Sequence, residues 1–215
     1  MILGDHPQSY GQAHLHIFGQ PRKSTSTIQI QQQIGFVSPE LFNAFPRRMG
    51  PQGLTVRDAI GTGFQSTFSY RKVSEAENSQ ISAILQELGP SAWSDGSSSR
   101  QETFGEEPFA SLTSGEQSLV LLMRALISRN RLLILDEPFA GMTDKMVLSA
   151  KNFLATRLKD HQAVVFITHW EHEVPWPDVQ RIALNDGRAI MQWFDSFLII
   201  RIMVDWQRIN IYASE

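Results

Sequence analysis

The sequence predicts an α/β protein with a parallel β-sheet at its core, and three features carry that prediction. Residues 132–135 and 163–167 are two short segments in which every side chain is apolar. Between them, apolar residues recur at helical spacing, at positions 146, 147, 150, 153, 154 and 158. Strands without polar alternation are buried on both faces, and strand–helix–strand order is typical of parallel pairing.

The composition fits a globular protein in a reducing compartment. The 215 residues are 42% hydrophobic and 19% charged, which allows a sizeable core and excludes a disordered or collagen-like chain. The absence of cysteine excludes a disulfide framework, a thiolate zinc site and a cysteine nucleophile. The formal net charge of −3 indicates no nucleic acid partner.

No segment predicts a membrane span or secretion. The longest apolar stretch, residues 197–204, is interrupted by Arg201 and is much shorter than the ~20 residues that a bilayer requires. Residues 1–7 have neither the basic nor the apolar region of a signal peptide. We therefore expect a soluble protein in the cytoplasm, with a mitochondrial location left open.

The first half of the chain predicts one strand and then helices. Residues 1–30 show no long period, whereas Ile34–Val37 is an apolar run that ends at Ser38 and Pro39 and is interpreted as a strand. Three helices are then indicated by capping boxes, in which a hydroxyl precedes a carboxylate by three residues. The pairs are Thr55 with Asp58, Ser74 with Glu77, and Thr113 with Glu116.

The ends and faces of these elements can also be predicted. The second helix has an apolar stripe and ends at Gly89 and Pro90, after which residues 91–107 are expected to be a loop. The third helix is apolar on nearly every side over residues 119–127, so we expect it to be buried on nearly every side. Residues 181–184 and 188–191 predict a hairpin around Asn185–Asp186–Gly187.

Two acids and a histidine follow the predicted parallel strands. Asp136 and Glu137 come directly after one strand and His169 follows the next. In α/β sheets ligands bind beyond the carboxyl ends of the strands, where Asp136 could hold magnesium and Glu137 could polarise a water. Alternatively, the acids simply mark where a strand meets solvent, and a lone histidine at a strand end is more often structural. The coincidence of both sites favours the functional interpretation.

The turn formed by Thr113, Ser114, Gly115 and Glu116 has two interpretations. It is either a capping box alone or an anion seat, because the free N–H groups at the start of a helix attract phosphate. Glu116 would repel a phosphate unless its carboxylate points back to the cap.

Taken in order, these segments resemble the nucleotide-binding domain of ABC-type ATPases. Leu112 to Glu116 is similar to the LSGGQ signature, residues 132–137 to the Walker B strand, residues 139–144 to the D-loop, and residues 167–169 to the segment of the switch histidine. Residues 4–10 (GDHPQSY) and 109–116 further resemble soluble tandem ABC ATPases of the molybdenum-transport or photorepair type and their fungal relatives.

The resemblance implies a set of roles and partners. Glu137 would be the catalytic base, His169 the γ-phosphate switch and Asp136 the magnesium residue. The signature turn would close over ATP held by a second nucleotide-binding domain, in a homodimer or a tandem half. Any role in transport would need separate membrane subunits.

Several positions depart from the family pattern. The sequence contains no GxxxxGK(S/T) phosphate loop, and in residues 19–25 an arginine and a proline replace the pattern that such a loop needs. We therefore expect a P-loop NTPase-like core that is truncated at the N-terminus and lacks its first strands and P-loop. Pro39 occupies the place of the Q-loop glutamine, Glu116 that of the signature glutamine, and Thr143 that of the D-loop aspartate.

The expected organisation follows from the resemblance. Residues 1–53 would be the remainder of the N-terminal core, 54–129 a helical signature subdomain, and 130–192 the Walker B half of the α/β core. Residues 193–215 remain an unassigned tail, either an appended helix or residues translated from outside the reading frame.

Three functional hypotheses follow. The chain is an ABC-type ATP hydrolase, or a module that cannot hydrolyse ATP alone but contributes its signature turn to a partner's site, or a truncated gene model with an exposed sheet edge. Losing the phosphate loop removes several charge-assisted contacts of ~1.5–3 kcal/mol each, so we expect this chain alone to be inactive.

Overall fold

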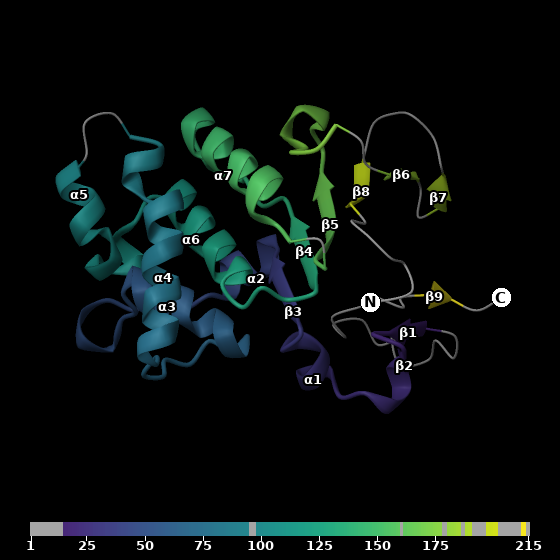
Figure 1. The fold of residues 1–215 in the computed structure, drawn as a ribbon, viewed down its shortest axis with the longest axis horizontal. Helices are drawn as coiled ribbons and strands as arrows, with labels where there is room; N and C mark the ends of the chain where they lie inside the picture. The colour runs from purple at the N-terminus through teal and green to yellow at the C-terminus, as the bar shows by residue number, and fades with distance from the viewer. Residues whose placement is uncertain are drawn as a thin grey trace.

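The computed structural model describes residues 15–94, 98–159, 161–177, 180–185, 188–190, 197–201 and 212–213. It is a mixed α/β fold, as the sequence predicts, with a six-stranded sheet in the order β3-β4-β5-β8-β6-β7. Figure 1 shows helices α3, α4 and α5 grouped on one side, with α6 between them and the sheet.

Three adjacent strands form the parallel part of the sheet. They are β3 (Ile34–Val37), β4 (Leu132–Asp136) and β5 (Ala163–Thr168), and all three match the apolar runs of the sequence. Leu132 pairs with both Ile34 and Ala163, so the three strands begin in line and their carboxyl ends lie at the same edge. The helix α7 (Asp144–Arg157) connects β4 to β5, as its spacing predicts.

The remaining strands of this sheet are antiparallel to their neighbours. Strands β6 (Gln180–Asn185) and β7 (Arg188–Ile190) confirm the predicted hairpin, whose turn residues 186–187 lie outside the described residues. Strand β8 (Phe197–Arg201) pairs with both β5 and β6. The expectation of an appended helix after residue 192 is therefore wrong for these five residues. Strand β8 therefore pairs with the edge of β5 that β4 leaves free.

A second, three-stranded sheet lies at the start of the described chain. It has the order β2-β1-β9, with β1 (Leu15–Ile17), β2 (Gln20–Pro21) and β9 (Tyr212–Ala213). The 3₁₀ helix η2 (Arg22–Ser24) and the helix α1 (Thr27–Gln31) follow. Residues 19–25 thus form part of a hairpin and a 3₁₀ turn, which is not the strand–loop–helix of a phosphate loop.

The predicted capping boxes open three helices, α3 (Val56–Gly61), α4 (Glu75–Leu88) and α6 (Ser114–Leu126). All three boxes are formed in both directions, and the aspartate of the first works as a glutamate does, accepting from Thr55 N at 3.0 Å. Helix α4 ends where Gly89 and Pro90 predict, and 3₁₀ helix η5 (Pro90–Ala92) follows.

The segment predicted as a loop after α4 contains helical turns. Helix α5 (Ser98–Thr103) and 3₁₀ helix η6 (Phe104–Glu106) lie within residues 91–107. Both are too short to show an apolar period. Burial of Phe104 and a hydrogen bond from the Gln101 side chain to Leu85 O at 2.8 Å hold them against α4.

Helix α6 is the centre of the main core. Every residue from Gly115 to Leu126 is buried, as its apolar surface predicts. Close packing on two sides requires glycine, because a Cβ at Gly35 of β3 would lie 2.1 Å from Ala125 O and one at Gly63 would lie 2.1 Å from Arg124 O. Helix α6 therefore joins the helical group to the sheet.

Short elements complete the chain between these helices and strands. They are α2 (Pro39–Ala44), η3 (Gly50–Gln52), η4 (Thr62–Gln65), η7 (Phe109–Ser111) and η8 (Glu171–Glu173).

Candidate functional site

Glu137 and His169 lie together just beyond the ends of β4 and β5. Asp136 pairs with Ile167 in the sheet, and Glu137 N donates to Ile167 O at 2.9 Å, which carries the pairing one residue further. His169 Nε2 is 2.9 Å from Glu137 Oε1. Both side chains are accessible, with 68% of the histidine and 39% of the glutamate side chain exposed. The structure thus brings the two sequence-predicted catalytic residues into direct contact at an open strand end.

The backbone at Glu137 is unusual. Its φ of 46° lies in the left-handed region, which few residues other than glycine adopt. Hydrogen bonds hold it there, since its N–H reaches Ile167 O and its own carbonyl accepts from Ala140 N at 3.2 Å. Residues in such conformations gather at functional sites, where the surrounding structure fixes them.

Asp136 lies at the end of β4 in a negative environment. Burial, followed by the charges of Glu137 and of Glu40 on α2, raises the pKa of its carboxyl, although His169 acts in the opposite direction. A magnesium ion is held in nucleotide sites by one or two carboxylates together with phosphate oxygens. The carboxylate donors at this strand end fit that chemistry, although among the described residues they form no cluster of three potential ligands that could hold a metal alone.

The signature-like turn forms the predicted capping box. Thr113 Oγ1 accepts from Glu116 N at 3.3 Å, and Glu116 Oε2 accepts from Thr113 N at 2.9 Å and from Thr113 Oγ1 at 3.0 Å. The Glu116 carboxylate therefore points back to the cap, while Thr113 and Ser114 are exposed. The anion-seat interpretation of this turn is compatible with the geometry and stays a prediction.

The turn packs against the segment that follows Glu137. A Cβ at Gly115 would lie 2.3 Å from Gly141 O, so only glycine allows this approach. Thr143, which replaces the D-loop aspartate, caps α7 by accepting from Met146 N at 3.4 Å. The signature-like and D-loop-like segments are therefore adjacent in one chain.

A hollow of about 260 Å³ lies between the residues that follow the strands and the signature-like turn. Ser38, Pro39, Phe42, Ser114 and Glu137 are among its lining residues, whereas Asp136 and His169 do not line it. Pro39, in the place of the Q-loop glutamine, is the first residue of α2, and Ser38 caps that helix by accepting from Leu41 N at 3.1 Å. Proline offers no side-chain donor or acceptor to this hollow.

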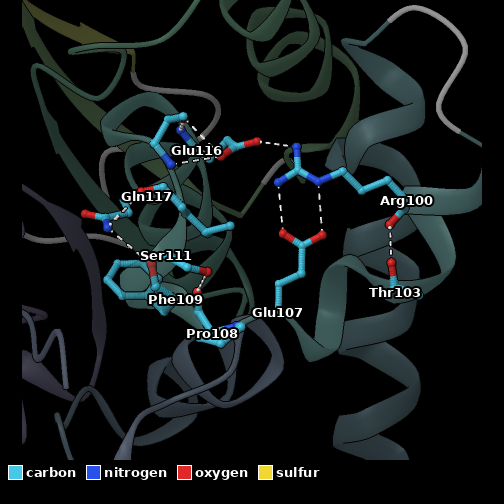
Figure 2. A network of polar contacts seen from close by, with 10 residues as sticks. Arg100, Thr103, Glu107, Pro108, Phe109, Ser111, Glu116 and Gln117 are labelled. Carbon is cyan, nitrogen blue, oxygen red and sulfur yellow. Dashed lines mark hydrogen bonds and ion pairs between the residues drawn. The ribbon is translucent and has the colours of Figure 1, made fainter. Parts of the chain in front are cut away.

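Two arginines support the turn and were missed by sequence reasoning. Arg47 Nε donates to Gln117 Oε1 at 2.9 Å, and the Gln117 amide donates to the carbonyls of Phe109 and Leu112 at 3.2 Å each. Arg100 binds Glu107 and Glu116 together, as Figure 2 shows. Arg47 lies 70 residues from Gln117 and Arg100 lies 16 residues from Glu116, so no local pattern indicates these two contacts.

The fold matches that of ABC ATPase cassettes, and the comparisons of sequence identify the family. The ABC transporter family profile matches residues 1–140. The chain is 31% identical over 193 residues to an uncharacterized ABC transporter ATP-binding protein of Schizosaccharomyces pombe, covering 88% of this chain and 36% of that protein. It is also 31% identical over 178 residues to the ABC transporter ATP-binding protein ModF of Escherichia coli, covering 81% and 33%. The protein therefore belongs to the ABC transporter family as an ATP-binding domain.

Solved cassette structures share the fold. The dimeric post-hydrolysis state of the ATP-binding cassette MJ0796 bound to ADP and Pi has a TM-score of 0.59 at 20% identity, covering 83% of this chain and 73% of that chain. A second dimeric structure of MJ0796 gives 0.53 at 22% identity, covering 77% and 66%. The chain spans only about a third of the length of the two relatives in the preceding paragraph. Within the described residues, no helix combines the length and hydropathy of a membrane span.

Proposed function

We propose that this chain takes part in ATP binding and hydrolysis as part of an ABC-type nucleotide-binding domain. The contact of 2.9 Å between His169 Nε2 and Glu137 Oε1 at the ends of two parallel strands carries the proposal. A carboxylate and an imidazole at the carboxyl ends of adjacent parallel strands support the proposal, because α/β proteins bind their ligands beyond these ends.

Glu137 would accept a proton from the attacking water. Its carboxylate is exposed and is aimed by the left-handed backbone and by His169. His169, with most of its side chain exposed, would hold the γ-phosphate with its imidazole while keeping the glutamate in position. Each residue thus orients the other before a substrate arrives.

Asp136 would bind the magnesium ion that accompanies ATP. The ion, when bound with the nucleotide, neutralises phosphate charge. Asp136 suits this role because burial and then the charges of Glu137 and Glu40 raise the pKa of its carboxyl, and a divalent cation would offset both effects. Glu40 would contribute to the same field from α2.

Thr113, Ser114 and Gly115 would contact ATP held by a second nucleotide-binding domain. The exposed hydroxyls of the first two, at the N-terminal end of α6, are the groups available for such a contact. The partner would be either a second copy or a tandem half. The relatives' names support an association with transport, which would require separate membrane subunits, and a cytoplasmic setting fits that role.

A second candidate is a module that completes a partner's ATP site without hydrolysing ATP itself. The sequence given contains no GxxxxGK(S/T) loop, and this observation favours the second candidate for the chain taken alone. In that case the signature turn would matter and Glu137 would not.

Two variants of the complete protein separate the candidates. Steady-state ATP turnover and MgATP-dependent association should both be measured for Glu137→Gln and Ser114→Arg, with the exposed Glu102→Gln as the control. Loss of turnover in both variants supports the hydrolase, whereas loss in Ser114→Arg alone supports the trans-acting module. Unchanged turnover and association in both variants contradict both candidates.

A further inference from the structure

We propose that Arg100 is a positioning residue that neutralises Glu116, so that the signature-like turn can face the phosphates of a partner-bound nucleotide. The inference rests on the proposed function and assigns a role to a residue outside the resemblance. Figure 2 shows the Arg100 guanidinium between the carboxylates of Glu107 and Glu116.

The turn has an electrostatic problem that the capping box alone does not solve. Glu116 is only 5% exposed and belongs to the first turn of α6, directly after the residues proposed to approach phosphate. An uncompensated carboxylate there would oppose an anion and would itself lose hydration. The box satisfies Oε2 through Thr113, which leaves Oε1 for another partner.

Arg100 is that partner. Its Nη1 donates to Glu116 Oε1 at 2.6 Å, while its Nε and Nη2 donate to Glu107 Oε1 and Oε2 at 3.0 and 2.9 Å. The paired contact with Glu107 fixes the plane of the guanidinium, which a lysine could not reproduce. The Nε–Nη2 edge of the guanidinium is therefore held by Glu107, and Nη1 contacts Glu116 in the signature-like turn.

Glu107, which holds Arg100, is itself hydrogen-bonded to the rest of the helical group. Glu107 O accepts from Val56 N at 3.0 Å, and Phe109 N donates to Leu54 O at 2.9 Å, so the segment carrying Glu107 is tied to the start of α3. The Arg100 guanidinium also lies 5.4 Å from the centre of the buried Phe104 ring. Arg100 is thus positioned by α3, α5 and η6 before it meets Glu116.

The ionisation of Glu116 reflects this arrangement. Burial acts to raise the pKa of its carboxyl, but hydrogen bonds from Arg100 and Thr113 outweigh burial, and the pKa lies below its ordinary value. The hydrogen bonds that Arg100 donates to Glu107 and then to Glu116 raise the pKa of Arg100 despite its desolvation. Glu116 therefore stays ionised, as its cap requires, and shares the positive charge of Arg100 with Glu107.

The test compares the concentration of MgATP that half-saturates association of the complete protein with its partner domain. Arg100→Gln should raise that concentration about tenfold or more, as expected for loss of a charge-assisted contact. Arg100→Lys should fall between Arg100→Gln and the wild type, because it keeps the charge but not the paired geometry. Thermal unfolding without nucleotide identifies any variant that fails to fold.

Two double variants distinguish neutralisation from simple support of the fold. Arg100→Gln with Glu116→Gln should return association to near the wild-type value, because the carboxylate in the first turn of α6 is then removed together with its partner. Arg100→Gln with Glu107→Gln should stay impaired, since Glu116 is still unpaired. Equal behaviour of the two double variants, or an Arg100→Gln variant that associates like the wild type, overturns the inference. If the wild-type protein does not associate with its partner domain in the presence of MgATP, the proposed function is contradicted as well.

Discussion

His169 Nε2 lies 2.9 Å from Glu137 Oε1, although the two residues belong to the ends of different strands. The register of β4 and β5 accounts for this contact, because Asp136, the last residue of β4, pairs with Ile167, and β5 ends one residue later at Thr168. Glu137 and His169 therefore directly follow the two strands at the same edge of the sheet. The hydrogen bond from Glu137 N to Ile167 O then turns the glutamate toward the histidine. The pairing of two apolar strands thus determines where the polar site lies.

Replacing Glu137 with glutamine should abolish hydrolysis and trap nucleotide in the assembled protein. The amide keeps the shape and a hydrogen bond to His169 but cannot accept the proton of water, and such general-base losses typically cost ~10²–10⁴ in rate. The measurement is single-turnover hydrolysis with retention of radiolabelled ATP after gel filtration. The exposed Glu102→Gln is the control, and unchanged turnover in Glu137→Gln would remove the assigned role.

Replacing His169 with alanine should also abolish hydrolysis, by roughly 10²-fold or more, while sparing the fold. The side chain is 68% exposed, so its removal leaves no core cavity. His172 is a suitable control because it lies on η8, near His169 in sequence but outside its contact with Glu137. A normal melting temperature with lost turnover is expected for His169→Ala, and normal turnover would argue against it as a switch.

A methyl group at Gly115 should separate the signature-like turn from the D-loop-like segment. The Cβ of Gly115→Ala would lie 2.3 Å from Gly141 O, a backbone atom that cannot move without its neighbours. Overpacking of this kind costs about 1–3 kcal/mol, so we expect a lower free energy of unfolding and weaker MgATP-dependent association. The neighbouring Ser114→Ala is the matched control for stability, because Ser114 is exposed. Equal stability of the two variants would show that the close approach is unimportant.

The contribution of Glu77 at the start of α4 to stability should be lost in acid, between about pH 4.5 and pH 2. Hydrogen bonds from Arg71 and then from Ser74 lower the pKa of Glu77 from 4.5 to about 2. Because the folded-state pKa lies below the unfolded one, the stabilisation is complete above about pH 4.5 and disappears as the pH falls through about 2. Glu77→Gln should therefore melt at a lower temperature than the wild type at pH 7, and the two curves should converge near pH 2.

The neighbouring acid provides the control for this pH dependence. Glu75→Gln also removes a carboxylate from the first turn of α4, but Glu75 does not form the capping box. At pH 7 we expect Glu75→Gln to lower the melting temperature by less than Glu77→Gln does. A Glu77→Gln curve that stays parallel to the wild-type curve down to pH 2 would contradict the assigned contacts.

The sequence predicts those parts of the fold that depend on local patterns. The strands β3, β4 and β5 are marked by continuous apolar runs, and the starts of α3, α4 and α6 by cap residues three positions before an acid. The site residues on β4 and β5 could also be anticipated, because parallel strands end at a common edge. Their contact, however, depends on a register that no single segment contains.

The features that the sequence missed depend on contacts between distant segments. Helix α5 has too few turns for a visible stripe, and β8 is defined by its pairing with β5 and β6. From the sequence, Arg100 is one charged residue in a polar segment. In the structure it forms ion pairs with Glu107 and Glu116. Non-local hydrogen bonds of this kind have no periodicity to detect.

Replacing Asp136 with asparagine should stabilise the fold and remove magnesium-dependent nucleotide binding. Burial and then the charges of Glu137 and Glu40 raise the pKa of Asp136 above 3.8. A folded-state pKa above the unfolded one means that ionisation costs stability, and this cost persists at pH 7 and vanishes below about pH 3.8. Because the carboxyl is partly solvated, we expect only a small gain in the free energy of unfolding at pH 7.

Asp144→Asn is the control for Asp136→Asn, because we expect it to lower the free energy of unfolding where Asp136→Asn raises it. Asp144 belongs to the first turn of α7, where a carboxylate favours the helix by roughly 0.3–1 kcal/mol, so its loss should lower the free energy of unfolding. Denaturant unfolding at pH 7 and at pH 3 measures both variants, and equilibrium binding of ATP to the complete protein with and without Mg²⁺ measures the function. A stabilised Asp136→Asn variant that binds MgATP like the wild type would show that the acid belongs to the negative field but not to the metal site.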